Sequence, residues 1–295
     1  MERRHLSGWR ESGIMALPTM RRRLPLALAT LFLALFVYEG VLRPGLAPLV
    51  RLPSFPGGLD VLTIFLMLFS LCHAAYTLGW RHALVFFALT TGISWAYEQV
   101  GVETGLIYGR YHYTDVLGVK IGHVPVLIPI AWFMMIYPSY VIANLIAGGP
   151  AVGSRGSLGR VVWLALLSAM VMTAWDLVID PILSGPAVRA WVWEEGGPYF
   201  GIPVQNYVGW MLTTFTVYML YRLYERRRRG QPAGPLPASV AALPVIAYAA
   251  MMLSNLLSGG APPALHVLAP FAMGLPVIAA LGRLLTKPEM GLQSR

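Results

Sequence analysis

Residues 158–181 read LGRVVWLALLSAMVMTAWDLVIDP, and this stretch decides the fold. It has no charged side chain from residue 161 to residue 175. About 20 apolar residues are enough for a helix to cross the hydrocarbon core of a bilayer. Two acids, Asp176 and Asp180, then close the stretch. The pattern predicts a transmembrane helix that carries two carboxyl groups at one end.

The composition of the whole chain agrees with this interpretation. Of its 295 residues, 57% are hydrophobic and 12% are charged, whereas roughly 25% are charged in soluble domains. The mean hydropathy is +0.62. These values exclude a soluble globular protein, a disordered chain and a coiled coil. The one cysteine, Cys72, has no partner for an internal disulfide.

Further apolar segments of similar length predict an all-α fold, a polytopic integral membrane bundle of about eight transmembrane helices. We expect one transmembrane domain over residues 24–288, after a basic segment at 1–23 and before a tail at 289–295. The first span is expected to remain as an anchor, because no small-residue cleavage site follows it. The eight segments begin near Leu24, Leu59, Ala83, Val124, Leu158, Tyr207, Val240 and Ala264.

The basic residues indicate the orientation of the bundle. Lys and Arg number 22 against 13 Asp and Glu, a formal charge of +9, and they cluster in alternate loops beside apolar segments. Such clusters mark cytoplasmic loops rather than a nucleic-acid site, so both termini are predicted to be cytoplasmic. Arg43 and Arg51 do not fit this orientation, because they lie in the first predicted outer loop. Glu39, where the first span closes, is expected to be a solvated helix end.

Three acids near the predicted outer ends of spans are candidates for function, because charge is costly at membrane depth. Asp176 and Asp180 are four residues apart, so a helix places them on one face, about 6 Å apart along its axis. Two carboxylates that close should not both ionise, and one is expected to keep a proton and serve as a general acid. Alternatively, both cap the helix or pair with Arg189. Glu98, three residues after Trp95, ends another predicted span and could meet them.

The two outer loops between these spans are rich in aromatic residues. Glycines and prolines between the aromatic residues favour fixed turns, so the loops could form a lid over a pocket. An aromatic belt at the membrane interface is the alternative. Asn206 is a candidate for holding water or a hydroxyl group, although we favour a helix cap there. The candidate substrate-binding residues are Trp95, Trp175, Trp191, Trp193, Tyr111, Tyr113 and Asn206.

Motifs for metals and nucleotides are missing from the sequence. The histidines show no His-x-x-x-His spacing, and there is no P-loop, dinucleotide fingerprint or Gly-x-Ser-x-Gly sequence. We therefore expect neither a metal site nor a cofactor.

Five blocks in order carry a resemblance to a known family. They cover about residues 95–210, and the number of predicted spans extends the similarity over most of the chain. The chain resembles the CruF family of integral-membrane carotenoid biosynthesis proteins. The blocks are Glu98-Gln-Val-Gly-Val-Glu-Thr-Gly105, Tyr108-Gly-Arg-Tyr-His-Tyr113, Val124-Pro-Val-Leu-Ile-Pro-Ile-Ala-Trp132, Ala174-Trp-Asp-Leu-Val-Ile-Asp-Pro181 and Gly201-Ile-Pro-Val-Gln-Asn-Tyr-Val-Gly-Trp210.

The resemblance implies carotenoid 1,2-hydration in a multi-pass protein of a bacterial cell membrane. Water adds to the terminal double bond of an acyclic psi end, on a chain such as lycopene, gamma-carotene or a C50 relative. The implied partners are the carotenoid, the lipid bilayer and other carotenoid biosynthesis enzymes. From the chemistry, Asp176 or Asp180 is the acid, and the ionised partner or Glu98 deprotonates the water. Tryptophan faces stabilise the cation.

Two other classes of function stay open at this point. In a proton-coupled transporter the acids would relay protons. A non-catalytic carotenoid-binding protein would present the pigment to other enzymes. Conversion of substrate by the purified protein separates hydration from both.

Overall fold

Helices make up most of the chain in this computed structural model, which describes residues 11–148, 157–227 and 236–286. Long apolar runs form them, and glycines and prolines mark many of the boundaries. The helices are α1 (Glu11–Val37), a π-helical turn (Tyr38–Leu42), α2 (Arg43–Leu46), α3 (Leu59–Leu78), α4 (Trp80–Thr104), α5 (Leu127–Gly148), α6 (Leu158–Leu183), α7 (Val204–Arg226), α8 (Ala238–Leu257), α9 (Leu265–Ala272) and α10 (Gly274–Thr286).

Six helical segments of the described chain are long and apolar enough to cross a membrane. They cover α1 to α2, α3, α5, α6, α8, and α9 with α10. The remaining long helices, α4 and α7, have 25 and 23 residues but more polar sequences. The predicted all-α helix bundle is thus confirmed, with six helical segments suited to crossing a membrane. The count of eight spans, the cytoplasmic termini and the single domain over 24–288 stay predictions, and the tail at 289–295 lies outside the described residues.

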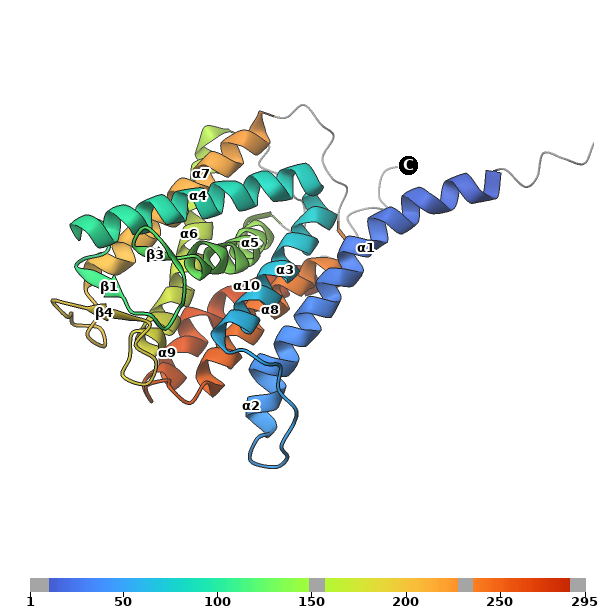
Figure 1. Cartoon of the computed structure of the whole chain (residues 1–295). Helices are drawn as coiled ribbons and strands as arrows, with labels where there is room; N and C mark the ends of the chain where they lie inside the picture. Colours follow the sequence, from blue (N-terminus) through green and yellow to red (C-terminus); the bar gives the residue numbers. More distant parts are fainter. Residues whose placement is uncertain (1–10, 149–156, 228–235, 287–295) are drawn as a thin grey trace, which may run out of the picture.

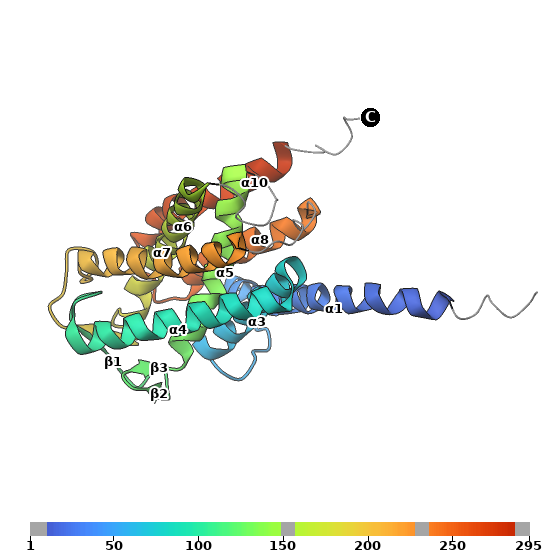
Figure 2. The same cartoon turned by 90° about the horizontal axis from the view of Figure 1, so that it is seen from above.

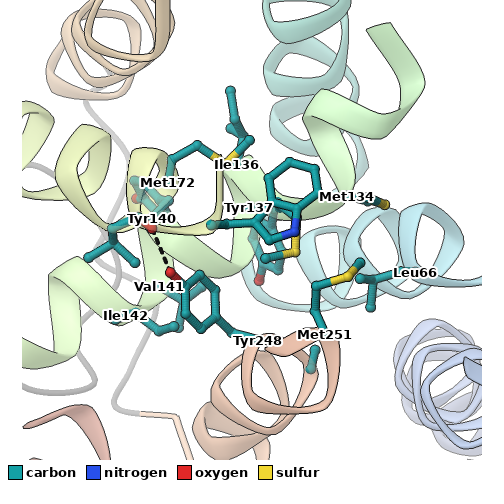
Figure 3. Packing of buried hydrophobic residues seen from close by; sticks show 14 of the residues in the cluster. Leu66, Met134, Ile136, Tyr137, Tyr140, Val141, Ile142, Met172, Tyr248 and Met251 are labelled. Atoms are coloured by element: carbon teal, nitrogen blue, oxygen red, sulfur yellow. Dashed lines mark hydrogen bonds between the residues drawn. The ribbon is translucent and has the colours of Figure 1, made fainter. Parts of the chain in front are cut away.

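The core is built around α5, which contacts α3, α4, α6, α8 and α10. Figures 1 and 2 show α5 in the middle of the bundle from two directions. Figure 3 shows side chains of α5 packed among Leu66 of α3, Met172 of α6 and Met251 of α8. An apolar helix that is buried on most sides can bring its neighbours together at a fixed geometry.

Helix α1 continues into a π-helical turn at the point where a solvated helix end was predicted. Glu39, within this turn, is only 6% exposed. Its carboxylate pairs with the Arg43 guanidinium at 2.7 Å and accepts a hydrogen bond from the Phe55 backbone at 3.3 Å. The prediction that Glu39 is solvated was therefore wrong, because the turn and the following loop close over it.

Two connecting loops form short strands that the sequence analysis did not predict. Strand β1 (Tyr111–Tyr113), between α4 and α5, pairs antiparallel with β4 (Trp191–Trp193), between α6 and α7. We call this pair the β1/β4 ribbon. Strands β2 (Lys120–Ile121) and β3 (Val124–Pro125) form a second small pair. The β1/β4 ribbon ties the two aromatic loops together at one end of the bundle (Figure 1).

Candidate active site

Helix α6 presents Asp176 and Asp180, and it continues through Pro181 to Leu183. Proline has no backbone N–H, so the carbonyl four residues earlier loses its helical partner. That carbonyl belongs to Leu177, and the Tyr199 hydroxyl donates a hydrogen bond to it at 2.8 Å. The helix therefore extends past the end predicted at Pro181, and both aspartates stay on its regular part. Each is 1% exposed.

Asn206 joins the two aspartates. Its side-chain Nδ2 donates to Asp176 Oδ2 at 2.9 Å and to Asp180 Oδ2 at 2.8 Å. Both amide hydrogens are thus in use. The favoured prediction that Asn206 caps a helix was wrong: Pro203 is the N-cap of α7, without a side-chain cap. Asn206 lies in the first turn of α7, where its side chain bonds to the two aspartates of α6.

The β1/β4 ribbon presents four aromatic side chains to the acids. Tyr111 pairs with Trp193, and Tyr113 pairs with Trp191. Side chains two residues apart in a strand point to the same face, so all four project from one face of the ribbon. The four rings also contact each other in pairs. The ring centroids are 5.0 Å apart for Tyr111 and Trp193 and 6.0 Å apart for Tyr113 and Trp191.

The tyrosines of the ribbon hold Glu98 of α4. The hydroxyls of Tyr111 and Tyr113 both donate to Glu98 Oε2, the second at 2.7 Å, and Trp132 Nε1 donates to Oε1 at 3.3 Å. Burial raises the pKa of both phenols well above the ordinary value, and the neighbouring Glu98 carboxylate raises it further. Both tyrosines therefore stay protonated as donors, and both oxygens of Glu98 are occupied.

The tryptophans of the ribbon hold Asp180 in the same way. Trp191 Nε1 donates to Asp180 Oδ1 at 2.8 Å, and Trp193 Nε1 donates to the same oxygen at 3.3 Å. With Asn206 on its other oxygen, Asp180 accepts three hydrogen bonds. Asp176 differs: its Oδ1 is buried and has no hydrogen-bond partner in the structure. Of the three acids, Asp176 has the free oxygen.

The acids line a largely apolar cavity of about 570 Å³. Small-molecule sites commonly enclose roughly 300–1,000 Å³. Three tryptophans form part of the wall: Trp132 stacks on Trp210 with centroids 4.1 Å apart, and Trp175 and Trp210 form a T-shaped pair with centroids 5.8 Å apart. Apolar side chains from α1, α3, α5 and α6 line much of the rest, including Phe36, Leu59, Leu62, Ile128, Ile179 and Leu183. The site thus combines a largely apolar cavity with an acid, Asp176, that has one oxygen without a hydrogen-bond partner.

The structure brings most of the predicted site residues together. Trp95 does not line the cavity, because its indole donates to the Ile121 carbonyl at 3.2 Å in the β2 strand. The alternative pairing of the aspartates with Arg189 is not seen: the ion pairs among the described residues do not include either aspartate. The predicted residues that line the cavity are Glu98, Asp176, Asp180, Trp175, Trp191, Trp193, Tyr111, Tyr113 and Asn206.

Some residues of the site were given no role in the sequence analysis. Trp132 and Trp210 are the last residues of two of the five sequence blocks that resemble the CruF family. Their place in these blocks was the signal that could have identified them as site residues. Asn255 of α8 also lines the cavity. A polar amide within an apolar run is unusual at membrane depth, and this could have identified Asn255 as a candidate. Within residues 11–148, 157–227 and 236–286, no group of three or more His, Cys, Asp or Glu side chains is arranged to hold a metal ion.

Comparison with known proteins gives two matches. A family model described as "Carotenoid biosynthesis protein" matches residues 58–281. Bisanhydrobacterioruberin hydratase from Haloarcula japonica is 30% identical over 158 residues, which are 53% of this chain. The chain spans about half the length of this curated relative, 50%. No solved structure matches.

Proposed function

Because the chain belongs to the carotenoid biosynthesis protein family, we propose that it is a carotenoid hydratase, which adds water to the C1=C2 double bond of an acyclic psi end. The name of the Haloarcula japonica relative supports hydration as the reaction. The observation that carries the proposal is the buried Asp176 Oδ1, which faces no hydrogen-bond donor in a cavity lined mainly by apolar groups.

The first step is transfer of a proton from Asp176 to the alkene. Asp176 Oδ2 accepts a hydrogen from Asn206, so Oδ1 is the oxygen left to carry a proton. Two carboxylates that share one amide nitrogen repel each other when both are ionised, which favours a proton on one of them. Asp180 has three donors and is suited to the ionised form, so the proton belongs on Asp176. It adds to C2, the less substituted carbon, and leaves a tertiary cation at C1.

The aromatic wall stabilises this cation. Trp175 and Trp210 line the same cavity as the acids, and the face of an indole attracts positive charge by on the order of 2 kcal/mol in a desolvated site. Such a contribution corresponds to roughly a tenfold to thirtyfold increase in rate. The negative charge of Asp180 adds attraction from the same side.

Water then completes the addition. Its oxygen bonds to C1, and its released proton returns to the Asp176–Asp180 pair, which restores the acid. The net change is one alkene plus one water to one tertiary alcohol. No electrons are gained or lost overall, so the reaction requires neither an oxidant nor a reductant.

The size of the cavity indicates how the substrate binds. A space of about 570 Å³ suits the end of a C40 or C50 polyene rather than the whole chain. We propose that the tip enters beside Asp176 and that the remaining polyene extends along apolar helix surfaces toward lipid. The acceptable substrates would then be lycopene, gamma-carotene or a C50 relative, each with a free psi end.

The test is conversion by the purified chain in detergent, with a psi-end carotenoid and no added nucleotide or metal. We expect a product heavier by one water, and the same product in a host that accumulates lycopene. Binding of the pigment without conversion would instead favour a carotenoid-binding protein. Proton uptake into vesicles without conversion would favour a transporter.

The membrane side of the reaction is part of the proposal. With cytoplasmic termini, the acids lie toward the outer face of the membrane. Reporter fusions at both termini test this orientation, and a terminus that reports from the outer side would contradict it.

A further inference from the structure

Among the described residues, three that line the cavity each have a buried polar side-chain atom without a hydrogen-bond partner. These atoms are Asp176 Oδ1, Trp175 Nε1 and Asn255 Nδ2. The other acids are engaged by the β1/β4 ribbon and by Asn206. A buried polar group without a partner costs free energy comparable to a lost hydrogen bond, so polar cavities commonly hold water at such groups.

Asn255 lies on the face of α8 that is turned to the cavity. Met251, Ser254, Asn255 and Ser258 all line it, and their spacing of three, four and seven residues places them on one side of a helix. Asn255 is 5% exposed, and its free Nδ2 is a hydrogen-bond donor. The cavity therefore has an uncommitted donor on α8 and an uncommitted acid oxygen on α6.

We infer that Asn255 holds the water that attacks the carotenoid cation, an inference that rests on the proposed hydration. Asn206 cannot do this, because its two amide hydrogens are bound to Asp176 and Asp180. A water that accepts a hydrogen from Asn255 Nδ2 keeps one lone pair for C1. Its hydrogens can face Asp176, which takes one back as the new C–O bond forms.

This role predicts that protonation and hydration can be separated. When the cation forms without a positioned water, it returns a proton to Asp176 and the alkene reappears. In D2O Asp176 delivers a deuteron, so C2 of the cation carries one H and one D. When the original H leaves to Asp176, the recovered carotenoid keeps deuterium at C2. Deuterium in the unhydrated substrate therefore reports the proton step alone.

The experiment compares the Asn255→Leu chain with the wild type in D2O, in detergent, by mass spectrometry of lycopene and its product. Leucine has nearly the shape of asparagine but no donor. We expect hydration to fall roughly tenfold to a hundredfold, as for loss of a hydrogen bond at a reacting group, while deuterium still enters the recovered lycopene. Asn255→Ser, which keeps a short donor, should restore part of the hydration.

Control variants separate the possible failures. Leu253→Ala, on the exposed side of α8 at 44%, should leave both readouts unchanged, and Asp176→Asn should abolish both. Trp175→Phe removes the other free donor. Loss of hydration alone in that variant, with Asn255→Leu unaffected, would place the water on the indole and overturn the inference.

Two further results would also overturn it. One is full hydration by the Asn255→Leu chain. The other is an equal loss of hydration and deuterium incorporation in both the Leu and the Ser variants, which indicates a structural role. If the wild type shows neither a gain of water nor deuterium, the proposed function itself fails, and that outcome is distinct from the others.

Discussion

Replacing each aspartate by asparagine should affect the protein in two different ways. In Asp176→Asn, the amide oxygen can take the place of Oδ2 and accept from Asn206, and the amide nitrogen occupies the position of the unpartnered Oδ1. The hydrogen bonds of the site are thus kept, and a neutral amide replaces the carboxyl group that carries the shared proton. We expect the free energy of unfolding to be unchanged or raised, while activity falls with the loss of the acid.

In Asp180→Asn, no orientation of the new amide group keeps all the hydrogen bonds of the carboxylate. Oδ1 faces the indole N–H groups of Trp191 and Trp193 at 2.8 and 3.3 Å, and Oδ2 faces Asn206 Nδ2 at 2.8 Å. An amide nitrogen at either position therefore meets a donor. A buried hydrogen bond replaced by two facing donors costs about 1–3 kcal/mol, so this variant should lose stability as well as activity.

The assays are thermal unfolding in detergent and conversion of a psi-end carotenoid. Loss of a general acid reduces the rate roughly 100- to 10,000-fold, which we expect for Asp176→Asn at wild-type stability. An active Asp176→Asn protein would refute its role as the proton donor. An Asp180→Asn protein as stable as the wild type would refute the hydrogen-bond arrangement from which its role is argued.

The other predictions concern the support of the site. Asn206→Leu leaves the two aspartates without their shared donor, so both stability and activity should fall in the same assays, and unchanged activity would contradict the bridging role. Tyr113→Phe removes one donor from Glu98 and should lower the free energy of unfolding by about 1.5–3 kcal/mol, measured by denaturation in detergent. Gly209→Ala puts a Cβ within 2.5 Å of a backbone oxygen of the α4–β1 loop and should destabilise by about 1–3 kcal/mol. Gly92→Ala, with no atom within 4 Å of the new Cβ, should be neutral or stabilising by up to about 1 kcal/mol; equal effects of the two alanines would contradict the packing argument.

The helices and the three acids could be predicted because their signals are local. Apolar runs of about 20 residues and charges within them are visible in the sequence without knowledge of neighbours. The four-residue spacing of Asp176 and Asp180 likewise placed both on one face of α6, where the structure has them.

The arrangement around the acids could not be predicted, because it depends on contacts between distant segments. The Tyr-His-Tyr sequence of β1 and the Trp-Val-Trp sequence of β4 alternate with the period of a strand, yet nothing local pairs one with the other. Trp95 was predicted to bind substrate because its spacing from Glu98 puts the two on a similar helix face. In the structure its indole donates to the Ile121 carbonyl instead. Asn206 is a strong capping residue, and a contact with another helix overrode that preference.

The β1/β4 ribbon also affects when the site can form during biogenesis. Its strands come from loops separated by the whole of α5 and α6, and contacts so distant along the chain close late because loop closure costs entropy. Until the ribbon pairs, Glu98 and Asp180 lack donors that they have in the finished fold. A nascent chain that has inserted α4 and α6 but has not yet paired the ribbon therefore contains these two acids without these donors.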